Sequence, residues 1–139
     1  MKTRTRRPFP SGLLLWGPVV AWMAAIFFVS GQSQPQVPAD LVNTTGHVIA
    51  YAVLGLLVVR ALAGRLPARI TGRMASLAVA ISVAYGISDE VHQMFVPGRT
   101  PDVMDVVADG AGALLATGAC WAWGILSRPG VQIPKPGSH

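Results

Sequence analysis

The residues best suited to chemistry lie at the edges of hydrophobic stretches, in a chain that otherwise carries few charges. The densest group is the segment Ser-Asp-Glu-Val-His-Gln-Met-Phe-Val-Pro-Gly-Arg at positions 88–99. It brings together two carboxyl groups, an imidazole, an amide and a guanidinium. Carboxyl and imidazole groups are common proton donors and acceptors, and arginine binds phosphate or carboxylate groups. This segment is therefore the first candidate for a functional site.

Three segments, one of which overlaps the first candidate, place polar residues at helical spacing. His47 and Tyr51 are four positions apart and share one face of a helix, with Gly55 one turn further. Two longer stripes follow the same spacing, namely Ser82, Gly86, Asp89 or Glu90, and Gln93 on one segment, and Asp102, Asp105, Asp109 and Gly112 on another. Small residues at Ala108, Gly112 and Ala116 allow close helix approach. We expect these faces to meet in one polar cluster.

Some of the acidic residues are readily explained by a purely structural role, and others are not. Asp102 and Asp40 stand just before apolar segments and are expected to act as N-cap or first-turn residues. Asp89 can be solvated at a helix end. Asp105 and Asp109 are harder to explain, because like charges at this spacing repel each other. We expect one of them to be protonated, or neutralised by Arg99 or a histidine.

The composition indicates a membrane protein. The chain has 139 residues, is 52% hydrophobic and 12% charged, and has a mean hydropathy of +0.49. Four stretches carry no charge: Leu13 to Ser30, Leu41 to Val59, Met74 to Ser88 and Gly110 to Ser127. Since crossing the hydrocarbon core takes roughly 20 residues, the third and fourth spans must include neighbouring polar residues. The predicted fold is an all-α integral membrane protein, a bundle of four transmembrane helices.

The basic residues predict the orientation. Lysine and arginine are concentrated before the first stretch, between the second and third, and after the fourth. Because short basic flanks stay on the inner side of the membrane, both termini are predicted to be cytoplasmic. The connections at 31–40 and 95–101, and with them all six acidic residues, then face outward. A cleaved signal peptide or a twin-arginine signal at the N-terminus is less favoured, because the first apolar stretch is long for a signal and its exit, Ser30 to Ser33, is a weak cleavage site.

Several function classes are disfavoured. The formal net charge of +5 reflects topology and attraction to anionic lipid, and no aromatic residues alternate with the basic ones as in a single-strand binder. We therefore expect no nucleic-acid partner. A metal site built from His47, Glu90, His92 and Asp105 is conceivable by residue type, but no zinc motif is present, so no metal is assigned. Ser88 lacks the context of a nucleophile, and Cys120 is expected to be an apolar packing residue.

The sequence resembles the VanZ-like family of membrane proteins. The resemblance rests on the segment 88–99, on Asp105, and on Asp109 followed three positions later by Gly112. The pattern Phe28-x-Ser30-x-Gln32 and the pair His47 and Tyr51 also fit, so that the match runs from about Trp16 to Gly118. Asp109 departs from the pattern, because many members have asparagine there.

The resemblance implies an integral membrane protein of the cell envelope with several spans in the cell membrane. The namesake of the family is associated with low-level antibiotic resistance, to the glycopeptide teicoplanin, but the resemblance carries no defined reaction and no cofactor. Residues 13–127 are predicted to form the VanZ-like four-helix domain. Residues 1–12 are predicted to be a basic cytoplasmic segment, and residues 128–139 a disordered cytoplasmic tail.

Two functions of different classes fit these residues, one of them enzymatic or ligand-binding and the other structural. In the first, the outer cluster binds or acts on an envelope lipid or glycolipid. His47 then shuttles protons, Glu90 and Asp105 act as acid or base, and Arg99 anchors a phosphate or carboxylate group. The remaining expected ligand-binding residues are Tyr51, Asp89, His92, Gln93 and Asp109. In the second, the cluster only holds the helices together. Membrane lipids are the expected partners in both cases, and the oligomeric state stays open.

Overall fold

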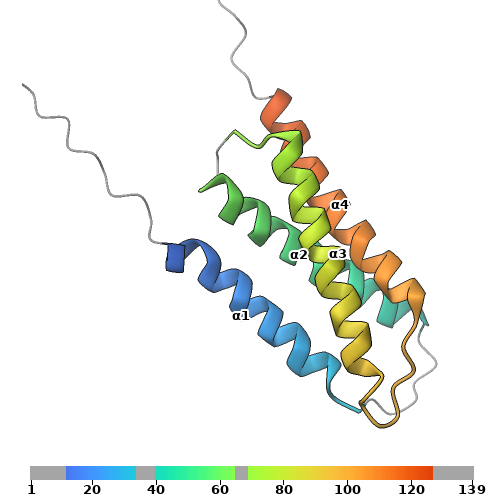
Figure 1. Cartoon of the computed structure of the whole chain (residues 1–139). Coiled ribbons are helices and arrows are strands. Elements are labelled where there is room, and N and C mark those ends of the chain that lie inside the picture. The colour runs from blue at the N-terminus through green and yellow to red at the C-terminus, as the bar shows by residue number, and fades with distance from the viewer. Residues whose placement is uncertain (1–11, 34–39, 65–68, 127–139) are drawn as a thin grey trace, which may run out of the picture.

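A computed structural model describes residues 12–33, 40–64 and 69–126 of the chain. These residues form four α-helices: α1 is Gly12–Ser30, α2 is Asp40–Ala63, α3 is Gly72–Gln93 and α4 is Val103–Leu126. Figure 1 shows them as an antiparallel bundle. The predicted tail at 128–139, and all but the last residue of the predicted N-terminal segment at 1–12, lie outside the described residues.

The four-helix prediction is confirmed, since all four helices are long and apolar enough to cross a membrane. As expected, α3 and α4 reach beyond their uncharged stretches. The α3 helix continues through Asp89 and Glu90, and α4 begins before Asp105 and Asp109. These four acidic residues are therefore parts of the spanning helices rather than of the connections between them.

Local chemistry explains where α3 and α4 begin. Thr71 precedes α3 with extended backbone, and its side chain accepts a hydrogen bond from the Met74 N–H at 3.2 Å. Asp102 precedes α4, and its Oδ1 accepts from the Met104 N–H at 2.8 Å. Both residues satisfy a helix N–H that has no partner within the helix. The N-cap role predicted for Asp102 is thus confirmed, whereas the side chain of Asp40 lies outside the description.

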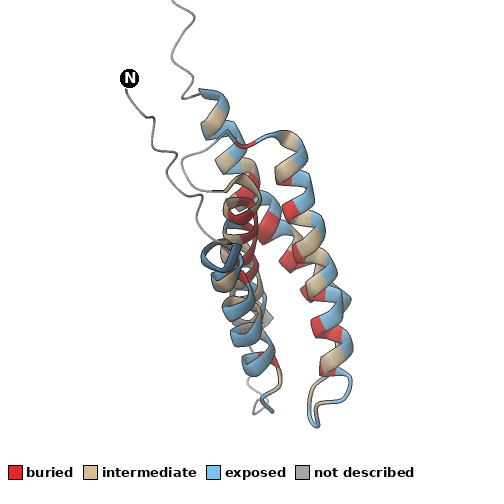
Figure 2. Cartoon of the chain, turned by 60° about the vertical axis from the view of Figure 1, so that its left-hand side comes forward, coloured by how far each residue is buried: buried red, intermediate tan, exposed pale blue. Residues whose placement is uncertain are grey.

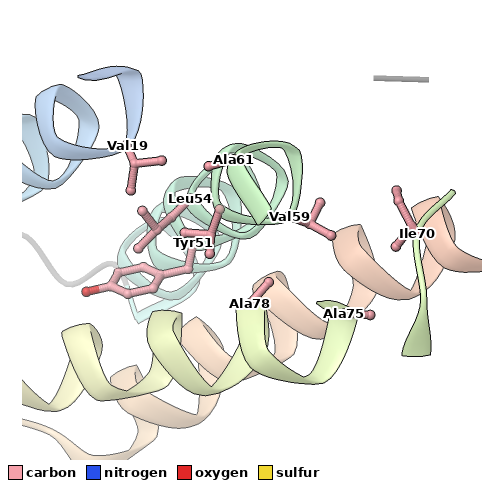
Figure 3. Packing of buried hydrophobic residues seen from close by; sticks show 9 residues of the cluster. Val19, Tyr51, Leu54, Val59, Ala61, Ile70, Ala75 and Ala78 are labelled. Carbon is pink, nitrogen blue, oxygen red and sulfur yellow. The ribbon is translucent and has the colours of Figure 1, made fainter. Parts of the chain in front are cut away.

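The core lies where α2, α3 and α4 meet, and small residues let these helices approach closely. Gly112 on α4 packs directly on the carbonyl oxygen of Val48, and Gly55 on α2 packs against Ala113. Figure 3 shows the apolar part of this core, with Tyr51 and Leu54 from α2 and Ala78 from α3. In Figure 2 the buried residues lie on the inward faces of the helices.

Helix α1 is peripheral. It packs mainly against α2, and only Val19 and Ser30 on it are buried. Two hydrogen bonds hold it by its middle. The Trp22 indole donates to the Ala50 carbonyl at 2.9 Å, and the Tyr85 hydroxyl donates to the Met23 carbonyl at 2.6 Å. The rest of its surface is apolar and exposed, as expected of a helix that faces lipid.

The charges separate between the two ends of the bundle. We call the end that carries Asp89, Glu90, Asp102, Asp105 and Asp109 the acidic end; α1 and α3 finish there, and α4 begins there (Figure 1). The opposite, basic end carries the described arginines 60, 69 and 73. The polar stripes predicted from the sequence therefore reach the same end of the bundle.

The orientation of the bundle in the membrane is a prediction that topology mapping can check. We expect reporter fusions at Gly137 and near Gly98 to give opposite compartment signals, with Gly137 cytoplasmic, because the basic flanks are retained inside. Alkaline phosphatase, active only outside, and green fluorescent protein, fluorescent inside, give complementary readouts. Matching signals at the two positions would remove the basis for an outward-facing acidic end.

Candidate functional site

His47 links the two aspartates of α4. Its Nδ1 lies 2.9 Å from Asp109 Oδ1, and its Nε2 lies 3.5 Å from Asp105 Oδ2. The imidazole can donate to both carboxylates only when both ring nitrogens carry hydrogen, that is, when the ring is positively charged. The repulsion expected between Asp105 and Asp109 is thus offset by a histidine, one of the two neutralising groups predicted from the sequence.

Two glycines make this arrangement possible. Asp109 is 1% exposed and lies against Gly86 of α3, where an added Cβ would sit 2.6 Å from Asp109 Oδ2. Gly112, one turn further along α4, permits the contact with Val48, the residue next to His47. Without side chains at these two positions, α4 approaches α2 and α3 closely enough for Asp109 to reach His47.

Asp89 is held in a closed hydrogen-bonded group. Its Oδ1 accepts from the Ser30 hydroxyl at 2.6 Å, and its Oδ2 accepts from the Gln93 amide at 3.2 Å. Asp89 is 3% exposed and Gln93 is 1% exposed. These bonds tie the end of α1 to the end of α3. Ser30 was not predicted as a site residue, although it is a polar residue at the end of an apolar stretch, the signal that could have revealed it.

Glu90 lies beside this group but is incompletely satisfied. Its Oε2 accepts from the backbone N–H of Asp102 at 2.9 Å, across the connection between α3 and α4. Its Oε1 is fully buried and has no hydrogen-bond partner. A buried acceptor without a donor costs about 1 to 3 kcal/mol, so this atom requires an explanation.

Tyr51 extends the cluster towards the middle of the bundle. Its side chain is 1% exposed, and its hydroxyl has no hydrogen-bond partner. The ring is 6.5 Å from that of His47 and 6.4 Å from that of Tyr85, measured between centroids. Figure 3 shows its hydroxyl at the end of the ring that points away from Val59 and Ile70. The hydroxyl is therefore directed towards the acidic end.

His92 and Arg99 lie nearer the surface of the acidic end. The His92 ring stacks on Phe27 of α1 with centroids 3.9 Å apart, and its Nδ1 has no partner. The backbone N–H of Arg99 closes a turn by donating to the Val96 carbonyl, and Gly98 in this turn has a φ of 82°. The Arg99 Nε is buried without an acceptor. The predicted pairing of Arg99 with Asp89, Glu90 or Asp105 is not formed.

The structure therefore places eight of the nine predicted residues at one end of the bundle and Tyr51 nearer its middle, and it divides them into distinct groups. His47, Asp105 and Asp109 form one group, and Asp89 with Gln93 forms another, whereas Glu90, Tyr51, His92 and Arg99 each keep an unpaired polar atom. Among the described residues, no group of three His, Cys, Asp or Glu side chains can hold a metal ion. The four residues considered as metal ligands do not converge, because His92 faces Phe27 instead.

Two surface hollows in the bundle lie away from these groups. One, of about 590 Å³, follows α1 from Gly12 to Ala24. The other, of about 430 Å³, lies between α3 and α4 and is lined by residues from Gly72 to Val79 and from Leu114 to Trp121. Both are mostly apolar and belong to the half of the bundle opposite the acidic end. At the acidic end, by contrast, Asp89, Glu90, Gln93, Asp105 and Asp109 are buried.

Four spanning helices with ionisable groups packed between them at one end define a multi-pass membrane protein with a buried polar cluster. The VanZ/LLP1 family model matches residues 15–126, which is most of the chain, and the protein belongs to this family. The resemblance noted in the sequence is thus confirmed. No curated protein and no solved structure matches the chain significantly.

Proposed function

We propose that the acidic end is a binding site for the polar headgroup of an envelope lipid or glycolipid. One observation carries the proposal. Among the described residues, the buried side-chain nitrogen and oxygen atoms without a hydrogen-bond partner are Tyr51 OH, Glu90 Oε1, His92 Nδ1 and Arg99 Nε. All four belong to residues that the sequence pattern singles out for this end. Polar atoms that only hold helices together are normally paired, because each orphan costs free energy.

The groups of the acidic end divide between support and binding. Asp89, with the bonds from Ser30 and Gln93, has the paired geometry of a structural contact between α1 and α3. For Asp89, Ser30 and Gln93 we therefore favour the structural alternative, in which the polar residues hold the helices together. Glu90 and Arg99 have the unpaired atoms that a ligand can complete. Because Glu90 Oε1 is fully buried, the ligand reaches it by displacing side chains near the connection between α3 and α4.

His47 adds a capacity for proton transfer beneath this site. Its two ring nitrogens face two carboxylates, so that a proton can pass between Asp105 and Asp109 through the imidazole. This arrangement supports a chemical step on the bound lipid in which Glu90 or Asp105 serves as acid or base. In the cell membrane, binding or altering an envelope lipid would change how glycopeptides of the teicoplanin type reach their target. Lowered susceptibility to such antibiotics is the physiological role that we propose.

The proposal is tested with conservative variants of the two carboxylates assigned to chemistry. We expect Glu90→Gln and Asp105→Asn to accumulate normally in the membrane and to keep their thermal stability in detergent, because the amides preserve the side-chain volume and one acceptor oxygen. Both should lose teicoplanin tolerance in cells that lack the native gene. The measurements are membrane abundance, melting temperature and growth at graded teicoplanin concentrations.

Arg73→Gln is the control, since it removes an exposed charge at the basic end and should retain tolerance. Alanine variants of Glu90 and Asp105 distinguish a binding site from a purely structural role. The structural role predicts that loss of tolerance always accompanies loss of folded protein. Folded Glu90→Gln and Asp105→Asn proteins with full tolerance would contradict the site and the roles of both residues.

A further inference from the structure

The two unpaired atoms next to the connection between α3 and α4 have opposite polarity. Glu90 Oε1 is an acceptor and Arg99 Nε is a donor, and both are buried. The two side chains do not pair with each other, although a short turn separates them in the sequence. A single ligand satisfies both atoms only if it carries both a hydrogen-bond donor and a hydrogen-bond acceptor.

The charge balance indicates what the donor is. Within the described residues, Asp105 and Asp109 share His47, and Asp89 is held by the uncharged Ser30 and Gln93. Glu90 receives only a backbone N–H, and no cationic side chain pairs with it. Since a buried carboxylate without a countercharge is costly, the group that completes the site at Glu90 is a cation.

The cation must also donate hydrogen bonds. A metal ion needs several converging ligands, and the described residues form no such set. A quaternary ammonium group has no N–H with which to satisfy Glu90 Oε1. A primary ammonium group has three N–H donors and can satisfy the unpaired Glu90 Oε1. The opposite requirement at Arg99 is met by a phosphate group, which guanidinium groups bind well.

We propose that the ligand is a zwitterion with a primary ammonium group and a phosphate group, bound with the ammonium at Glu90 and the phosphate at Arg99. This inference rests on the proposed function and specifies the ligand of the same site. Glu90 lies three residues before Gln93, the last residue of α3, and hence about 5 Å below that helix end. The end of a span of this length lies near the boundary between the hydrocarbon core and the headgroups, so an amino phospholipid can present its headgroup to the site.

The experiment compares phosphatidylethanolamine with phosphatidylcholine, which differ in the hydrogens on nitrogen, by native mass spectrometry of the full chain in detergent. We expect the ethanolamine lipid to bind about tenfold more tightly, the effect of one charge-assisted hydrogen bond to a buried carboxylate. Glu90→Gln should abolish this preference. Arg99→Gln should weaken the binding of both lipids to the same extent, because both carry the phosphate group. Arg73→Gln should not change the binding of either lipid.

Equal binding of the two lipids by the native protein would overturn the inference without requiring any variant. If the two lipids bound equally but binding still depended on Arg99, the proposed headgroup site would be retained and only the assignment of an ammonium group to Glu90 would be wrong. A preference for ethanolamine that persists in Glu90→Gln would also overturn it. Binding that depends on neither Glu90 nor Arg99 would contradict the proposed function as well. Displacement of the lipid by soluble phosphoethanolamine would support recognition of the headgroup itself, whereas displacement by glucosamine alone would contradict the phosphate contact.

Discussion

Gly112→Ala is expected to destabilise the bundle severely. A Cβ at this position would overlap the backbone carbonyl of Val48, and a helix backbone cannot move aside as a flexible side chain can. Helices α2 and α4 must separate, which also lengthens the bond between His47 and Asp109. Overpacking of this kind costs about 3 kcal/mol, more than the roughly 1 kcal/mol that alanine gains over glycine in a helix. Membrane abundance and melting temperature in detergent should both fall sharply.

Gly118→Ala on the same helix is the matched control. An added Cβ at Gly118 has no atom within 4 Å, so this variant gains helix propensity without a clash. It should be as stable as the native protein or slightly more stable. If both glycine variants behaved alike, the close approach of α2 and α4 at Val48 would be wrong, and with it the geometry that brings His47 to Asp109.

The fold could be predicted from the sequence because the membrane restricts the solutions. A span must be helical and about 20 residues long, so the apolar stretches and the positions of the arginines defined four helices and two differently charged ends. Helical spacing also predicted that Asp105 and Asp109 share a face and need a neutralising group. His47 fills that need because it projects from the facing helix at the same level.

Which polar residues of the acidic end are paired and which are unpaired could not be predicted from helical spacing. Asp89 and Glu90 are neighbours in the sequence, yet one is fully paired and the other keeps a buried orphan oxygen. The difference depends on Ser30, which arrives from α1, and on the backbone of Asp102, which follows the turn at Gly98. For the same reason the expected pairing of Arg99 with a carboxylate was wrong. The turn at Gly98 does not bring the Arg99 guanidinium into an ion pair with these carboxylates, and turn geometry is not encoded in helical spacing.

His47→Ala is expected to be the most damaging change within the cluster. Asp109 is almost fully buried, and the variant removes the ring nitrogen 2.9 Å from its carboxylate. Breaking a buried pair by removing one partner costs about 3 to 5 kcal/mol, because the remaining charge has lost its countercharge. Asp105 has a further interaction besides His47, so most of the loss should be due to Asp109.

A double-mutant cycle with Asp109→Asn tests this assignment. The amide is close in size to the carboxylate, matches the asparagine of the family pattern, and leaves no buried charge behind when the imidazole is removed. Asp109→Asn alone should therefore remain folded, and His47→Ala should cost about 2 kcal/mol less in the Asp109→Asn background than in the native protein. Denaturation of the four proteins in the same detergent gives the coupling free energy directly. A coupling near zero would mean that His47 does not neutralise Asp109, and the proton path proposed between Asp105 and Asp109 would lose its central residue.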